Sequence, residues 1–143
     1  MCIRDSNEIT EQFDVRHAGS KLAARNLSGG NLQKFVVGRE INKLPSVLII
    51  NQPTWGVDAV SAMRIRESLL TLAGSGSAIV VISQDLDELL EISDQLAVLH
   101  HGSLSTAKSV DAWNIEQLGL AMTGSVSDPA MSDPATDHQN GFA

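Results

Sequence analysis

The sequence predicts an α/β fold in which a parallel β-sheet is flanked by helices. Two short apolar runs, residues 47–50 and Ala78–Ile82, have the length and composition of buried strands. An amphipathic stretch with helical spacing, residues 59–73, connects them. A strand, a helix and a second strand in succession indicate a parallel pair joined by a right-handed crossover.

The segment before this sheet is predicted to be helical at both ends. Between residues 7 and 16, Ile9, Phe13 and Val15 suit the last turns of a helix that enters a short extended piece, and the polar residues 17–26 are typical of a loop. A second helix follows Ser28 and ends before Pro45, which cannot continue it. Its apolar positions recur at helical spacing and are Leu32, Phe35, Val36, Gly38 and Ile41.

The remaining elements follow from the same signals. Asp58 is predicted to cap the helix over 59–73, which ends at Gly74. Next come a short acidic helix, a third strand of the sheet, a hairpin turn, a short fourth strand and a last helix, predicted at residues 85–92, 95–99, 100–103, 104–106 and 110–122. Residues 124–143 hold almost no large apolar side chain and are predicted to be a disordered tail. Residues 1–6 are interpreted as a scar unrelated to the fold, so the domain spans 7–123.

Composition and charge exclude several classes of function. Ten Lys and Arg against seventeen Asp and Glu give a net charge of −7, which argues against a nucleic-acid partner. No apolar run approaches the roughly 20 residues of a membrane-spanning helix, so direct membrane insertion is not expected. A single cysteine, Cys2, excludes an internal disulfide.

The motif most suggestive of function is the octet Leu-Ser-Gly-Gly-Asn-Leu-Gln-Lys at residues 27–34. A hydroxyl and two glycines at the start of a helix place unpaired N–H groups and the positive end of the helix dipole where an anion would be stabilised. By itself the pattern fits two interpretations. Ser28 either caps a surface helix, which is the commoner arrangement, or turns its hydroxyl outward towards a phosphate.

The octet resembles the signature motif of ATP-binding-cassette (ABC) ATPases, in the form found in importers of sugars and nucleosides. That resemblance implies a P-loop NTPase-like fold of which this chain is the C-terminal part. It also implies that the signature contacts the γ-phosphate of an ATP molecule held by a second nucleotide-binding domain. The residues concerned would be Leu27, Ser28, Gly29, Gly30, Asn31 and Gln33.

The ends of the two predicted strands carry the other matching positions. Residues 47–58 resemble a Walker B strand and D-loop, with Asp58 at the D-loop aspartate. The two acidic positions of that motif hold Asn51, where Mg²⁺ would bind, and Gln52, where a glutamate would polarise water. Gln84 replaces the histidine of the switch segment. Neutral amides are weaker metal ligands than carboxylates and cannot act as general bases, so these positions imply a degenerate site.

No P-loop sequence occurs in the chain, so its own residues would complete a site without making one alone. The resemblance implies ATP and Mg²⁺ as cofactors, with a second nucleotide-binding domain and transmembrane permease subunits as partners. It places the chain at the cytoplasmic face of the membrane, as the second of two fused domains. The alternatives are a catalytically silent interaction module, a truncated fragment, and a chromosome-maintenance ABC ATPase. The last is disfavoured by the lack of long heptad repeats.

Three further features are interpreted as structural. His100 and His101 are adjacent and fit a solvated turn better than a metal pair. Trp55 and Trp113 are predicted to pack. The acidic residues Asp85, Asp87, Glu88 and Glu91 are predicted to form the solvated face of a short helix.

Overall fold

The computed structural model describes residues 3–16 and 24–124 and divides the chain into two compact units, Met1–Ile92 and Ser93–Ala143. The tail from residue 125 onward and residues 17–23 of the predicted loop lie outside the described residues. Among the described residues, no helix has both the length and the apolar character that a membrane crossing requires.

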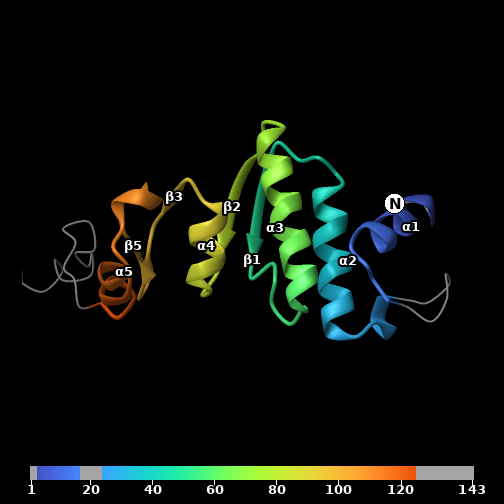
Figure 1. The fold of residues 1–143 in the computed structure, drawn as a ribbon, viewed down its shortest axis with the longest axis horizontal. Helices are drawn as coiled ribbons and strands as arrows, with labels where there is room; N and C mark the ends of the chain where they lie inside the picture. The colour runs from blue at the N-terminus through green and yellow to red at the C-terminus, as the bar shows by residue number, and fades with distance from the viewer. Residues whose placement is uncertain (1–2, 17–23, 125–143) are drawn as a thin grey trace, which may run out of the picture. The chain divides into compact units, whose positions relative to one another are not determined.

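The first unit places helices beside a pair of parallel strands (Figure 1). Its elements are α1 (Ile3–Gln12), α2 (Gly29–Ile41), β1 (Val47–Asn51), α3 (Ala59–Gly74), β2 (Ala78–Ile82) and α4 (Leu86–Ile92), with a short 3₁₀ turn at Ala24–Asn26. Strands β1 and β2 pair in parallel, in register from Val47 opposite Ala78 to Asn51 opposite Ile82. Helix α2 packs between α1 and α3, and α3 contacts both β2 and α4. The predicted parallel arrangement is confirmed.

The core of this unit lies where α1, α2 and α3 meet one face of the strands. Ile65 of α3 and Phe13, just after α1, are almost completely buried. The other buried apolar residues of this cluster are Ile9, Val15, Val37, Ile41, Leu48, Leu69 and Leu72. Burial of each such side chain contributes about 1.5–3 kcal/mol before the loss of conformational entropy is counted. The core therefore packs residues that precede 17–23 in the sequence against residues that follow them.

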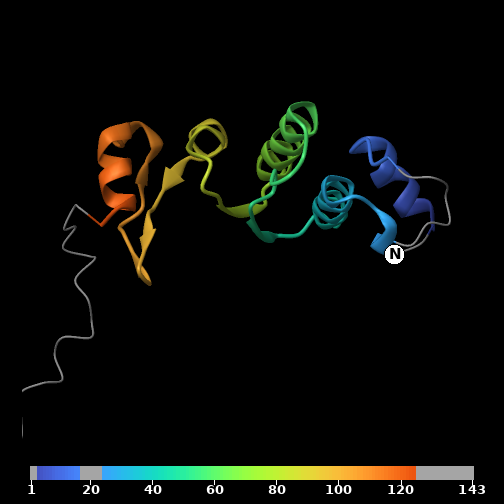
Figure 2. The ribbon, with the colours of Figure 1, turned by 90° about the horizontal axis from the view of Figure 1, so that it is seen from below.

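The strands are buried on one face only. Leu48, Ile50, Ile79 and Val81 belong to or pack against the core. The alternate residues are exposed, at 62% for Val47, 69% for Ile49, 51% for Val80 and 48% for Ile82. Figure 2 shows the reason, because the helices of this unit lie on one side of the strand pair. The prediction of buried strands therefore holds for one face of the pair and is wrong for the other.

The second unit is built from short antiparallel pairs and a helix. Its elements are β3 (Gln95–Leu96), β4 (Leu99–His100), β5 (Ser103–Leu104), β6 (Lys108–Ser109), a 3₁₀ turn at Val110–Ala112 and α5 (Ile115–Met122). Strand β3 pairs with β6 and β4 with β5. Leu118, Ala121, Leu96 and Val98 are buried.

The predicted third parallel strand at residues 95–99 is wrong. The predicted hairpin turn explains the difference. His101 and Gly102 have φ angles of 45° and 83°, and His100 pairs with Ser103, as in a two-residue hairpin loop. The turn folds the chain back on itself, so the strand hydrogen bonds of residues 99–100 are made locally and antiparallel. The last predicted helix also divides, into Val110–Ala112 and α5.

Helices α1 and α2 contact each other through a glycine. A Cβ added at Gly38 would lie 2.5 Å from Cδ2 and 2.7 Å from Cε2 of Phe13, and 3.0 Å from Cγ2 of Ile9. These distances are shorter than van der Waals contact, so only glycine admits the Phe13 ring here.

Helix α4 contradicts its predicted solvated acidic face at one position. Glu88 is 2% exposed, and neither carboxylate oxygen has a hydrogen-bond partner among the described residues. Its neighbour Glu91 instead forms an ion pair with Arg66 of α3, at 2.9 Å. A buried carboxylate without a donor costs free energy, because nothing replaces the water it has lost.

We predict that Gly38→Ala lowers the free energy of unfolding by about 1–3 kcal/mol, because the added methyl group overpacks the contact with Phe13. Urea denaturation followed by circular dichroism measures the change. Gly74→Ala is the matched control, since a Cβ there meets nothing within 4 Å. Equal effects of the two substitutions would contradict the packing argument.

We also predict that Glu88→Met raises the free energy of unfolding by about 1–3 kcal/mol, because an apolar side chain of similar length removes the cost of the unpaired carboxylate. The same urea titration measures it. Glu67→Met, at an exposed position of α3, should change stability by less than about 0.5 kcal/mol. A loss of stability in Glu88→Met would show that the carboxylate has a favourable partner.

Candidate functional site

The signature residues lie at the N-terminus of α2. Leu27 packs against the core of the first unit and fixes the approach to the helix. Ser28 occupies the N-cap position in an extended conformation, with φ −61° and ψ 158°, but its hydroxyl makes no capping bond to the helix backbone. The hydroxyl oxygen accepts a hydrogen bond from Nδ2 of Asn31 at 2.9 Å instead. Ser28 therefore holds the capping position without making the usual capping bond.

The glycines of the motif allow a close approach between α2 and the turn before α3. A Cβ added at Gly30 would lie 2.6 Å from the carbonyl oxygen of Gly56, whereas one at Gly29 would meet nothing within 4 Å. Gly56 itself has a φ of 72°, which favours glycine. The signature and the D-loop turn are thus in direct backbone contact within one unit.

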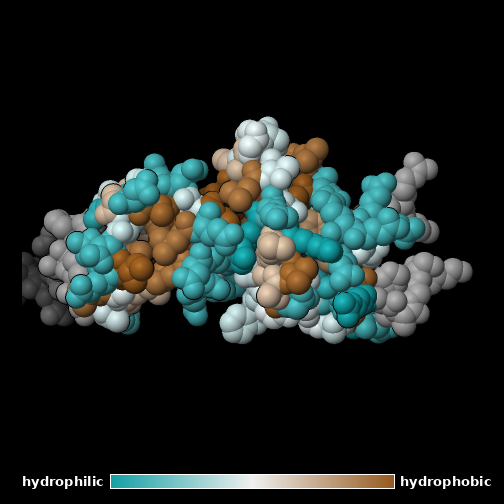
Figure 3. All heavy atoms as spheres, in the orientation of Figure 1, coloured by the Kyte–Doolittle hydropathy of each residue, from teal (hydrophilic) through white to brown (hydrophobic). Residues whose placement is uncertain are grey.

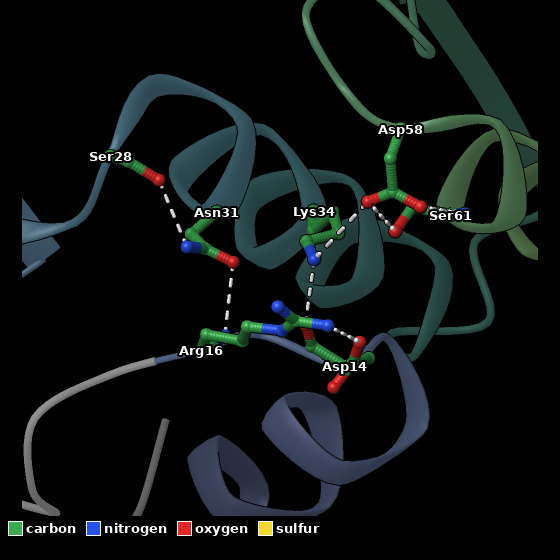
Figure 4. A network of polar contacts seen from close by, with 7 residues as sticks. All are labelled: Asp14, Arg16, Ser28, Asn31, Lys34, Asp58 and Ser61. Atoms are coloured by element: carbon green, nitrogen blue, oxygen red, sulfur yellow. Dashed lines mark hydrogen bonds and ion pairs between the residues drawn. The ribbon is translucent and has the colours of Figure 1, made fainter.

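A hollow of about 310 Å³ lies between these two segments. Figure 4 shows the polar side chains around it. Its lining residues are Arg16, Ser28, Gly30, Asn31, Lys34, Gly56, Val57 and Asp58. Two cations and one carboxylate face it, and the positive end of the α2 dipole adds to the cations. The hollow therefore combines hydroxyl, amide and cationic groups that suit an anion.

Sequence reasoning missed both of these cations as site residues. Lys34 ends the octet at residues 27–34, and its position one helical turn beyond Gly30 and Asn31 is the signal that indicates it. Arg16 carries no such signal, because it is brought to the motif only by the fold. Its backbone N–H donates to Oδ1 of Asn31 at 3.0 Å, and its guanidinium lies 3.7 Å from the Asp14 carboxylate.

Lys34 is buried, with a side chain only 5% exposed. Its ammonium donates to the carbonyl oxygen of Asp14 at 2.6 Å and lies 4.0 Å from Oδ2 of Asp58. Because a buried ammonium needs acceptors, these contacts hold the end of the α1 segment, α2 and the D-loop turn together.

Gln33 connects the signature helix to the end of β1. Its Nε2 donates to the carbonyl oxygens of Gln52 at 2.9 Å and Pro53 at 3.1 Å. Gln52 has a φ of 50°, so its backbone is held in a conformation that non-glycine residues seldom adopt. Its N–H donates to the carbonyl oxygen of Ile82 at 2.7 Å, which joins the turn to the end of β2.

The three amide positions gather at this edge of the strand pair. Asn51 ends β1 opposite Ile82, Gln52 follows it, and Gln84 lies two residues beyond β2. Asn51 and Gln84 are exposed and Gln52 is half-buried. The strand ends thus bring together the predicted degenerate positions, while the signature Ser28 and Asn31 line the separate hollow beside Asp58.

Asp58 caps α3, as predicted. Its Oδ1 accepts from the backbone N–H of Ser61 at 3.0 Å, and its Oδ2 accepts from the Ser61 hydroxyl at 2.7 Å. These bonds, the hydroxyl first, stabilise the ionised carboxylate and lower its pKa from 3.8 to about 2, with a smaller contribution from Lys34. Asp58 is therefore a fixed anion over the physiological pH range.

One predicted packing residue is not packed. Trp55, in the turn between β1 and α3, is 73% exposed. Trp113 does pack, and its Nε1 donates to the carbonyl oxygen of Leu96 at 3.1 Å while Lys108 lies 4.7 Å from its ring centroid. Figure 3 shows other apolar side chains reaching the surface over α3, where Val60, Met63 and Leu70 are exposed.

The described residues do not fit a metal site. No group of three or more His, Cys, Asp or Glu side chains within 3–16 and 24–124 is placed to hold an ion. Asn51 offers one neutral oxygen at the predicted position, which is a weak ligand for Mg²⁺.

Solved structures identify the fold as that of part of an ABC ATPase domain. The chain aligns with the ATP-binding subunit of an ABC transporter with a TM-score of 0.72 and 18% identity, over 84% of this chain and 53% of that one. It aligns with the ATP-binding cassette MJ0796, in a dimeric post-hydrolysis state bound to ADP and Pi, with a TM-score of 0.66 and 19% identity, over 77% of this chain and 47% of that one.

Curated relatives are named as import ATP-binding proteins. The nucleoside import ATP-binding protein NupA of Lactococcus lactis subsp. cremoris (strain MG1363) is 41% identical over 119 residues, 83% of this chain and 24% of that protein. The glucose import ATP-binding protein TsgD13 of Haloferax volcanii is 41% identical over 118 residues, 81% of this chain and 22% of that protein. No family model matches the chain.

These comparisons confirm the resemblance predicted from the signature octet. The chain is related to the ATP-binding proteins of sugar and nucleoside importers and spans about a quarter of the length of the curated relatives that it matches.

We predict that Asp58→Asn changes the acid arm of the stability profile. Because the folded pKa lies below the usual value of 3.8, the carboxylate contributes stability above about pH 4 and loses that contribution as the pH falls to about 2. The variant should be less stable than the parent at pH 6, with the gap closing towards pH 2. Urea titrations across this range measure it.

Asp87→Asn, at an exposed position of α4, is the matched control and should follow the parent profile. Parallel profiles for the parent and Asp58→Asn would contradict the capping assignment.

Proposed function

We propose that this chain is the signature-bearing part of an ATP-binding subunit that energises the import of sugars or nucleosides. The observation that carries the proposal is the octet at residues 27–34. It begins α2 and lines a hollow with two cations, Arg16 and Lys34. The kinship with nucleoside and glucose import ATP-binding proteins supports the same function.

In this proposal ATP is bound between two domains. The other domain supplies the P-loop, and this chain supplies Ser28, Gly29 and Gly30 to the γ-phosphate. The hydroxyl donates a hydrogen bond, and the glycines let the phosphate approach the backbone of the first helical turn. Asn31 and Gln33 support this arrangement from the same helix.

The chain's own strand-end side is proposed to turn over ATP poorly. Asn51 and Gln52 occupy the positions of the Mg²⁺ ligand and the water-polarising glutamate, and Gln84 that of the switch histidine. None of these side chains carries a negative charge or accepts a proton near neutral pH. Asp58 keeps its charge and holds the D-loop turn against the signature helix.

The wider assembly follows from the same proposal. The second nucleotide-binding domain is fused to this one or separate, and transmembrane permease subunits carry the substrate. The subunit is then peripheral, at the cytoplasmic face of the membrane. ATP is bound with Mg²⁺, whose ligands are supplied mainly by the P-loop domain.

We predict that Ser28→Ala in the complete subunit, assembled with its permease, lowers the kcat for ATP hydrolysis about 10- to 100-fold, because one donor to the transferred phosphoryl group is lost. Release of inorganic phosphate measures it. Ser46→Ala, at an exposed residue before β1, is the control and should leave kcat unchanged. An unchanged kcat in Ser28→Ala would overturn the proposal and favour a silent interaction module.

A further inference from the structure

We propose that Asn31 is a positioning residue that directs the Ser28 hydroxyl towards the bound phosphate. This inference rests on the proposed function of the signature. It differs from a direct contact between Asn31 and the nucleotide, because Asn31 acts here through Ser28. Figure 4 shows Asn31 between Ser28 and Arg16, at the rim of the hollow.

The orientation of the Asn31 amide is fixed by a donor that cannot accept. The backbone N–H of Arg16 lies 3.0 Å from one end of the amide, so that end must be the oxygen Oδ1. The other end is then the nitrogen Nδ2, which lies 2.9 Å from the Ser28 hydroxyl. Because Nδ2 only donates, the Ser28 oxygen must accept.

The hydrogen bond from Asn31 leaves the proton of the Ser28 hydroxyl available for donation to another group. A hydroxyl has one proton and two lone pairs, so an oxygen that accepts from Asn31 still donates its own proton elsewhere. Serine at an N-cap usually turns its oxygen to the N–H groups of the first helical turn. Ser28 makes no such bond although its backbone has the N-cap conformation. Asn31 therefore holds the hydroxyl away from the helix backbone.

The surroundings of the hydroxyl favour an anionic acceptor. The hollow that Ser28 and Asn31 line also holds Arg16, whose side chain is 83% exposed, and the buried Lys34, whose ammonium lies 4.0 Å from the Asp58 carboxylate that shares the lining. A proton donated by Ser28 here adds to the Arg16 charge and to the positive end of the α2 dipole, and a phosphate oxygen can accept it. Arg16 thus has two roles. Its guanidinium charge lies at the hollow, and its backbone N–H fixes the orientation of the Asn31 amide.

A double-mutant cycle between Ser28 and Asn31 tests the proposal in the complete subunit with its permease, using ATP as the probe. Asn31→Ala should lower kcat about tenfold when Ser28 is present. In the Ser28→Ala background the same change should lower kcat less than about twofold, because the group through which it acts is gone. KM for ATP should change less than kcat in both backgrounds.

Asn31→Asp separates this role from a loss of folding. A carboxylate of the same shape still accepts from the Arg16 N–H but cannot donate to Ser28, so it should lower kcat at least as much as Asn31→Ala. Asn42→Ala, at the exposed C-terminal cap of α2, is the control for the Asn31→Ala change in the same helix and should leave kcat unchanged. Melting temperatures of all variants are measured alongside.

The outcomes divide cleanly. An equal loss from Asn31→Ala in both backgrounds would overturn the proposal, because Asn31 would then act on the nucleotide or on the fold without Ser28. Full activity of Asn31→Asp would also overturn it. If Ser28→Ala alone leaves kcat unchanged, the proposed function of the signature fails first, and this inference fails with it.

Discussion

The site depends on how a buried ammonium is satisfied. Lys34 lies inside the first unit, where an unpaired charge would cost several kcal/mol. Its ammonium donates a hydrogen bond to the carbonyl oxygen of Asp14 and lies farther away, at 4.0 Å, from the carboxylate of Asp58. Those acceptors belong to the end of the first helical segment and to the turn before α3. The requirement of one lysine therefore brings together three parts of the chain that are distant in sequence, and the hollow is the space that remains beside them.

The same helix is held to the strand ends by contacts of a different kind. Gly30 permits backbone contact with Gly56, and Gln33 donates to two carbonyl groups around the strained Gln52. The Gln33 amide, which donates to the carbonyl oxygens of Gln52 and Pro53, helps to hold this backbone conformation. Helix α2, the D-loop turn and the end of β1 consequently form one connected body. A displacement of the first turns of α2 would therefore move the Gln33 amide that is hydrogen-bonded to the backbone of Gln52.

The features that could be predicted from the sequence are those that a few neighbouring residues determine. The cap at Asp58, the strands β1 and β2 and the turn at His101 each depend on a few neighbouring residues, and the structure contains all of them. The signature at the start of α2 was recognisable for the same reason. What failed depends on tertiary packing, which no short window contains. Gln95 and Leu96 pair antiparallel with Ser109 and Lys108, which lie beyond the hairpin, and the burial of Glu88 depends on the packing of α4.

The hollow beside the signature and the ends of β1 and β2 differ in the chemistry that their side chains allow. Around the signature, a hydroxyl, an oriented amide and two cations lie beside the Asp58 carboxylate, and in the proposed function the hydroxyl binds a phosphate. At the strand ends, Asn51, Gln52 and Gln84 can form hydrogen bonds but carry none of the charges that metal binding and proton transfer need. Binding a phosphate and activating water are separable tasks, because the first needs donors and the second needs a base. A chain that keeps the first and loses the second is suited to completing a site on another domain, which is the division of labour that we propose for this protein.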